Sequence, residues 1–256
     1  MKIIKRILIL FLVLTVMTGC GSSSSNSPES GSDSKPSESS KEESKPKEPV
    51  LAYEITDTIS NIYEADYGMG TKFNVIIEVQ NTGDVALYMK DATIDYEDDN
   101  GHLLQTYDFL SKVPDIIQPG EKGYIYTNGS GSFDDGVDFS NGCNLVPNLT
   151  LVQAKGELKR YEVEDTSLYT DSLMKTVGIK GRIINNTKED VSMIYVTTVY
   201  YDANDKVLGI SGTTVTNIKA DSKTSFDDSG FFLQTDFSVD DVARYEVYAD
   251  EMYLQF

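Results

Sequence analysis

Two short acidic stretches hold the residues whose types and spacing are most suited to chemistry. The first, IDYEDDNGHLL, runs from Ile94 to Leu104, and the second, VYYDANDKVLG, runs from Val199 to Gly209. Clustered Asp, Glu and Asn oxygens are ligands for Ca²⁺, and paired carboxylates can act as general acid and base. The same residue types also reverse the chain, because they tolerate left-handed backbone angles and cap turns. The sequence favours this last interpretation.

The spacing does not fit a helix-loop-helix calcium site. Such a loop needs acidic residues at its first, third and fifth positions, Gly at the sixth and Glu at the twelfth. With Gly101 as the sixth residue, Tyr96 is the first and Tyr107 the twelfth. A calcium site built from the loops Phe133–Gly136 (FDDG) and Phe226–Gly230 (FDDSG) stays open as an alternative. One His and two Cys do not make a zinc cluster, so we expect no metal and no cofactor.

Catalytic groups are equally scarce. His102 is the single histidine and follows the turn Asn100-Gly101, with no nucleophile near it in sequence. We expect an exposed turn residue. No glycine-rich phosphate loop is present, and abundant Asp on loops is what solubility alone produces. The sequence therefore predicts a protein that is not an enzyme, with an unrecognised hydrolase as the least favoured alternative.

Net charge excludes one class of partner. The chain carries a formal charge of -19, which repels nucleic acid phosphates and anionic lipid surfaces. We therefore expect no nucleic acid partner, and any membrane attachment must have another source.

The N-terminus predicts that source. Lys2, Lys5 and Arg6 precede an apolar run, Ile7–Val16, that is too short to span a bilayer comfortably, as in an export signal. The residues before Cys20 resemble the bacterial lipobox, although Met17 stands where that pattern prefers Leu. The resemblance implies that Cys20 becomes the first mature residue and carries acyl chains such as palmitate.

Such a lipid would anchor the protein to the outer face of the cell membrane without a spanning helix. Residues 20–49 are rich in Ser, Pro, Glu and Lys and almost free of apolar residues, which predicts a disordered linker. Once Cys20 is acylated, Cys143 is the only thiol left, so no intrachain disulfide can form. We expect Cys143 to be small, partly buried and unreactive.

From about Leu51 the sequence predicts strands throughout, arranged as a tandem duplication. Apolar residues alternate in Phe73–Val79 and in Ala92–Tyr96, and the same order returns in Val177–Ile183 and Thr197–Tyr201. Each unit of about 100 residues fits an immunoglobulin-like β-sandwich. We predict a signal peptide at 1–19, the lipidated cysteine and linker at 20–49, and all-β sandwich domains at 50–160 and 161–256.

The second unit also resembles the FxLYD family of small bacterial domains, through GRIINNTKEDVSMIYVTTVYYDANDKVLG. The residues at the positions of its motif are Gly181, Ile183, Asn185, Tyr201, Asp202, Val207 and Leu208. The first unit matches more loosely, through Val79, Asn81, Tyr96 and Gly101, with Glu97 in place of the Asp. The resemblance implies a β-sandwich on a surface lipoprotein and brings no catalytic residues.

Comparison of the two units predicts an interface. If Ala92, Ile94 and Tyr96 face the first core, their counterparts Thr197, Val199 and Tyr201 face the second. The residues that alternate with these counterparts would then form an outward apolar strip, consisting of Ile194, Val196, Thr198 and Tyr200. This strip would contact a partner or the other sandwich.

The leading functional hypothesis is a non-catalytic, lipid-anchored module that binds a protein or glycan in a bacterial envelope. The alternative is a structural spacer or accessory subunit of a membrane-associated complex.

Overall fold

The computed structural model describes residues 48–65, 69–173, 176–230, 233, 237–253 and 255. The predicted signal peptide, Cys20 and the linker through Lys47 lie outside the described residues. Residues Pro49–Phe256 form one compact unit. In the part of the chain that is described, no helix is long and apolar enough to cross a membrane.

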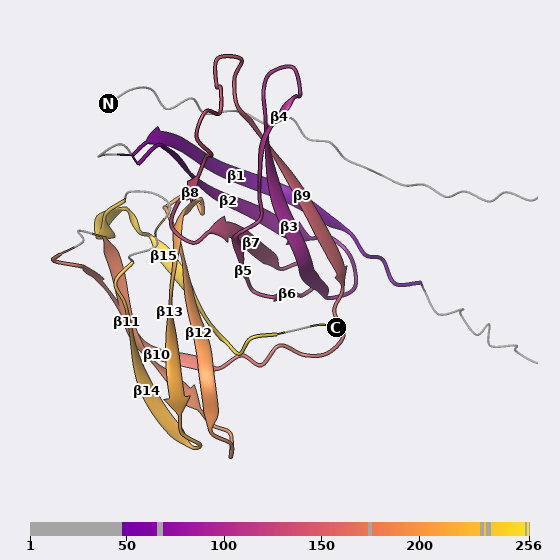
Figure 1. Ribbon diagram of the computed structural model, residues 1–256. Coiled ribbons are helices and arrows are strands. Elements are labelled where there is room, and N and C mark those ends of the chain that lie inside the picture. Colours follow the sequence, from indigo (N-terminus) through magenta and orange to yellow (C-terminus); the bar gives the residue numbers. More distant parts are fainter. Residues whose placement is uncertain are drawn as a thin grey trace, which may run out of the picture. The chain divides into compact units, whose positions relative to one another are not determined.

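Strands dominate this unit, as Figure 1 shows. The first half of the unit contains β1 (Tyr53–Glu64), β2 (Thr71–Asn81), β3 (Leu87–Glu97), β4 (Leu103–Tyr107), β5 (Leu110–Val113), β6 (Ile116–Ile117), β7 (Lys122–Thr127), β8 (Gly131–Ser132) and β9 (Asn144–Gln153). The second half contains β10 (Glu162–Thr170), β11 (Val177–Asn185), β12 (Val191–Tyr201), β13 (Val207–Ile218), β14 (Ser222–Asp228), the 3-10 turn η2 (Val239–Asp241) and β15 (Arg244–Asp250).

The first half is a sandwich of two antiparallel sheets. One sheet has the order β1-β2-β7-β5, with β8 also paired to β2, and the other places β3 between β4 and β9, with β6 also paired to β3. Alternate residues of β2, among them Phe73 and Val79, meet Ile94 and Tyr96 of β3 in one buried core. The prediction that Ala92, Ile94 and Tyr96 face the first core is confirmed.

The second half repeats this plan with fewer strands. Its sheets have the orders β10-β11-β14 and β13-β12-β15. Ile179 and Ile183 of β11 pack against Ile194 and Val196 of β12 in a second core. The all-β sandwich prediction is therefore confirmed, while the domain boundary at 160/161 stays a prediction.

One buried asparagine forms hydrogen bonds that hold the end of the second strand in each half. The side-chain amide of Asn81 donates to the carbonyl oxygens of Val85 and Ile117, at 2.8 and 3.0 Å. Asn185 donates in the same way to Glu189 and Lys219, at 2.9 and 3.0 Å. Because a buried amide without partners costs stability, these bonds explain why an asparagine ends the apolar run in both places.

Candidate functional site

The first acidic stretch forms a turn held by one carboxylate. Oδ1 of Asp98 accepts hydrogen bonds from the backbone N–H groups of Asn100 and His102, both at 2.8 Å. Gly101 has a φ of 79°, in the left-handed region that glycine adopts readily. These bonds lower the pKa of Asp98 to about 2, chiefly through the backbone N–H of His102, against the opposing effect of burial.

The second stretch forms the same turn with different residues. Oδ1 of Asp202 accepts from the backbone N–H groups of Asn204 and Lys206, at 2.8 and 2.9 Å. Asp205 has a left-handed φ of 60°, at the position that Gly101 occupies in the first turn. The pKa of Asp202 is lowered, first by the N–H of Lys206. Both acidic clusters therefore use a carboxylate to reverse the chain.

The lowered pKa of Asp98 predicts how the stability of the fold changes in acid. A carboxylate with a lowered pKa stabilises the fold above its ordinary pKa, and this stabilisation is lost as the pH falls toward the folded value. Between about pH 4 and about pH 2 the wild-type protein should lose stability that Asp98→Asn does not lose, because Asn keeps the accepting oxygen and does not titrate. Urea unfolding across this range tests it, with the exposed Asp134→Asn as control. Equal acid sensitivity of Asp98→Asn and wild type would contradict the role of the carboxylate.

The loops left open as a calcium site do not bring their acids together. Asp134 and Asp135 are exposed, whereas Asp228 is buried and its Oδ2 accepts from the Ser211 hydroxyl at 2.6 Å. Asp227 pairs with Lys180 at 3.3 Å. Among the described residues, no group of three or more His, Cys, Asp or Glu side chains is placed to hold a metal ion.

His102 and Cys143 lie where the sequence predicts. His102 is 78% exposed, and its Nδ1 lies 3.0 Å from Oδ2 of Asp98. Cys143 is a half-buried free thiol that packs against the first core. Burial raises the pKa of Cys143 to about 11, so the reactive thiolate is disfavoured at neutral pH.

The predicted outward strip is wrong. Ile194, Val196, Thr198 and Tyr200 are all fully buried. Ile194 and Val196 belong to the second core, and the hydroxyl of Tyr200 bonds Ser211 Oγ of β13 at 2.9 Å. The error is a one-residue slip between the two units, because the matching turns align Asp98, and not Glu97, with Asp202. A slip of one residue exchanges the two faces of a strand.

The opposite face of β12 is the one that makes an interface. Val199 and Tyr201 pack with Val207 and Ile210 of β13 against residues from the first half. Those residues are Ile76 of β2, Val113 of β5, and Tyr124 and Tyr126 of β7. All eight side chains are at most 7% exposed, so the two halves share a third core, here called the junction. Thr197 also faces this side and hydrogen-bonds Tyr126.

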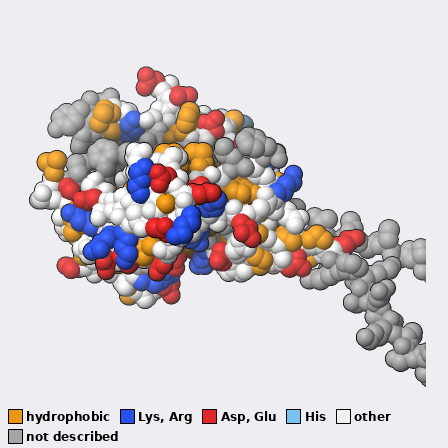
Figure 2. Space-filling model, turned by 90° about the horizontal axis from the view of Figure 1, so that it is seen from below, with side chains coloured by type: hydrophobic (Ala, Val, Ile, Leu, Met, Phe, Trp, Pro, Cys, Tyr) orange, Lys and Arg blue, Asp and Glu red, His pale blue; other side chains and the backbone are white. Residues whose placement is uncertain are grey.

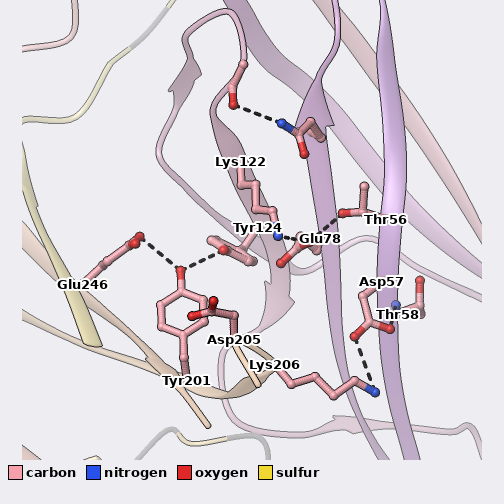
Figure 3. Close-up of polar contacts among 12 residues, drawn as sticks. Thr56, Asp57, Thr58, Glu78, Lys122, Tyr124, Tyr201, Asp205, Lys206 and Glu246 are labelled. Carbon is pink, nitrogen blue, oxygen red and sulfur yellow. Dashed lines mark hydrogen bonds and ion pairs between the residues drawn. The ribbon is translucent and has the colours of Figure 1, made fainter. Parts of the chain in front are cut away.

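A chain of polar contacts crosses the junction, drawn in Figure 3. The hydroxyls of Tyr124 and Tyr201 lie 2.8 Å apart, and Tyr201 donates to Glu246 Oε2 at 3.1 Å. Since a carboxylate only accepts, Tyr124 must be the donor to Tyr201. Tyr248 donates to the same Glu246 oxygen at 2.8 Å. This chain satisfies hydroxyl groups that would otherwise be costly to bury.

Ion pairs surround these tyrosines. The guanidinium of Arg244 lies 3.5 Å from the ring centre of Tyr201 and pairs with Asp205 at 2.6 Å. Lys206 of the second half and Asp57 of the first are 3.8 Å apart, a pair visible in Figure 3. Because these charged groups are largely exposed, their contribution to stability is small. The buried apolar contacts hold the junction.

The sequence carries only a partial signal for the junction. Ile76 occupies an outward position of β2, between Val75 and Ile77 of the core face. A strand that is apolar on both faces is buried on both faces. The same reading applies to β12, where Val199 and Tyr201 lie on the face opposite Ile194 and Val196.

One shallow hollow on the described surface lies in the second half. This hollow, of about 190 Å³, is lined by Lys159, Tyr161, Thr187, Glu189, Asp190, Val191, Ser192 and Glu251. Two of its charged side chains have ion-pair partners: Lys159 lies 3.7 Å from Glu251, and Asp190 lies 2.6 Å from Lys219. Figure 2 shows the same mixing of acidic and basic side chains over one face of the molecule.

No family matches the chain, and no curated protein matches it. The resemblance to FxLYD domains therefore stays a prediction from the sequence motif.

Proposed function

We propose that this chain is a lipid-anchored, non-catalytic interaction module of a bacterial envelope, held at the outer face of the cell membrane through Cys20. Its domains at 50–160 and 161–256 are immunoglobulin-like and similar to FxLYD domains. The observation that carries the proposal is the N-terminal sequence, in which a short basic and apolar signal ends at a lipobox-like cysteine.

Two features of the folded unit support a binding role. The acids that suggested chemistry hold turns with their carboxylates, as Asp98 and Asp202 do. The shared junction fixes two sandwiches as one body, which presents long strand edges in a constant arrangement. A partner protein or glycan of the envelope would be bound on that body.

The junction also favours the alternative of a structural spacer or accessory subunit, because buried contacts between two sandwiches give a spacer a fixed length. Affinity purification from intact envelopes, without cross-linking, separates the two functions. A spacer should recover one membrane complex in constant stoichiometry, and a binding module should recover ligands that exchange with added competitor.

The anchor has its own test. Cys20→Ala should release the protein from the membrane fraction, because only the cysteine thiol can accept the lipid. Fractionation of cells, followed by detection of the full chain in pellet and supernatant, measures this, with Cys143→Ala as the matched control. Equal membrane retention of Cys20→Ala and Cys143→Ala would contradict the lipid anchor.

A further inference from the structure

The edges of the four sheets differ in how they are protected against pairing with another strand. Exposed edges invite such pairing, and proteins block it with charges, prolines, bulges or short strands. Here β1 and β10 are acidic and carry register shifts, β9 contains Pro147, and β14 and β15 carry several charged residues. The edges β4 and β5 are only five and four residues long.

β13 has none of these protections along its exposed part. Its sequence, VLGISGTTVTNI, contains no charged residue and no proline. It is an edge strand, paired only with β12 among the described strands. Leu208 and Ile210 make further interactions near its start, and β14 lies close to β13, so the part of the edge that concerns us is Gly212–Thr216. Thr214 and Thr216 are exposed there.

Charge indicates what fits this edge. In a chain of net charge -19, two copies repel each other over most of their surface. Pairing β1 or β10 antiparallel with itself would bring acidic residues of two copies close together. Like charges opposite each other destabilise a ladder. Gly212–Thr216 has no charge to bring near its copy.

We propose that the Gly212–Thr216 edge is a self-association site, at which β13 pairs antiparallel with β13 of a second copy about a twofold axis at Thr214. Thr213 then lies opposite Val215 of the other copy, and Gly212 opposite Thr216. Thr–Thr and β-branched pairs are favourable cross-strand neighbours. The two β13-β12-β15 sheets become one continuous six-stranded sheet. The interface is isologous, so the assembly closes as a dimer.

Disulfide trapping tests this geometry in the full chain. Residues directly opposite in an antiparallel ladder have Cα atoms about 4.5 to 5.5 Å apart, within the range that a disulfide spans. In a Cys143→Ser background, Thr214→Cys should form a disulfide-linked dimer in cells under mild oxidation. Ser167→Cys is the matched control, since Ser167 is also exposed on an edge strand, β10. We expect cross-linking at Thr214 to be at least about tenfold faster.

Introducing a charge at the same position gives a second readout. Thr214→Lys places two ammonium groups opposite each other at the axis, which should weaken the dimer at least about tenfold. Light scattering after size exclusion of the full chain in detergent measures the mass, with Ser167→Lys as control. A dimeric wild type, a dimeric Ser167→Lys and a monomeric Thr214→Lys would support the site. The site would be overturned by a monomeric wild type or by an unchanged mass for Thr214→Lys. It would also be overturned by equal cross-linking of the two cysteine variants, or if Thr214→Cys captured a different protein in place of a second copy.

Discussion

Replacing Val196 and Tyr200 together by serine is expected to unfold the second half of the protein. Val196 lies in the second core, and Tyr200 is fully buried with its hydroxyl bonded to Ser211. Truncating a large buried side chain costs roughly 2 to 5 kcal/mol, so the pair should cost about 5 kcal/mol or more. That is comparable with the whole stability of a typical domain, about 5 to 15 kcal/mol.

The matched control changes the other face of the same strand. Val199→Ser with Tyr201→Ser removes two side chains from the junction and none from the second core. Hydrogen exchange should then show β11 and β12 still protected while β7, with Tyr124, gains exchange. In the first double variant β11 and β12 should lose protection. If both variants gave one exchange pattern, the two faces of β12 would not have separate roles.

Raising the pH above about 10 is expected to destabilise the protein steeply, because buried tyrosines must stay protonated. Burial raises the pKa of Tyr124 and of Tyr201 far above the ordinary value, and raises that of Tyr126 to about 12. A group with a raised folded pKa stabilises the fold fully below its unfolded pKa, and this contribution is lost as pH rises toward the folded value. Three such groups alone make the free energy of unfolding fall by about 4 kcal/mol per pH unit.

Urea unfolding at several pH values above neutral measures this slope, and tyrosinate absorbance reports ionisation directly. Tyr124→Phe removes one titrating group and should reduce the slope by about 1.4 kcal/mol per pH unit. Exposed Tyr63→Phe is the control and should leave the slope unchanged. Tyrosinate formation at all sixteen tyrosines near pH 10, with the fold intact, would be the contrary result.

The sequence predicts the sandwiches and their turns well, because those depend on local pattern. Alternation in Phe73–Val79 identifies the core face of β2, and the Asp-x-Asn spacing in Asp98–Asn100 and Asp202–Asn204 identifies the turns. These features need only neighbouring residues to form.

The junction could not be read in the same way. β12 is apolar on both faces, so alternation alone does not say whether Val196 or Val199 faces the core. The choice depends on Ile76 and Tyr124, which lie far away in sequence. Aligning the two units on Asp98 and Asp202 settles the register, since the turn fixes where the strand ends.

The junction has a consequence for assembly, because it joins faces that are not equivalent in the two halves. It pairs the outer face of the sheet containing β2 with that of the sheet containing β12, the counterpart of β3. Asn185 follows Asn81, and Asp202 follows Asp98, each by 104 positions (185 minus 81, 202 minus 98). By that spacing Ile76 corresponds to Lys180, and Val199 corresponds to Asp95.

A single module that carried both of these apolar faces could add copies head to tail, as a ring if the rotation closes and as a filament if it does not. In this chain each of the two apolar faces contributes once to the junction. The corresponding position in the other half carries a charge, Lys180 on β11 and Asp95 on β3. Charged end faces of this kind terminate a repeat array. The contact is therefore made once, between the two halves of one chain, and Lys180→Ile with Asp95→Val would place an apolar residue at both corresponding positions.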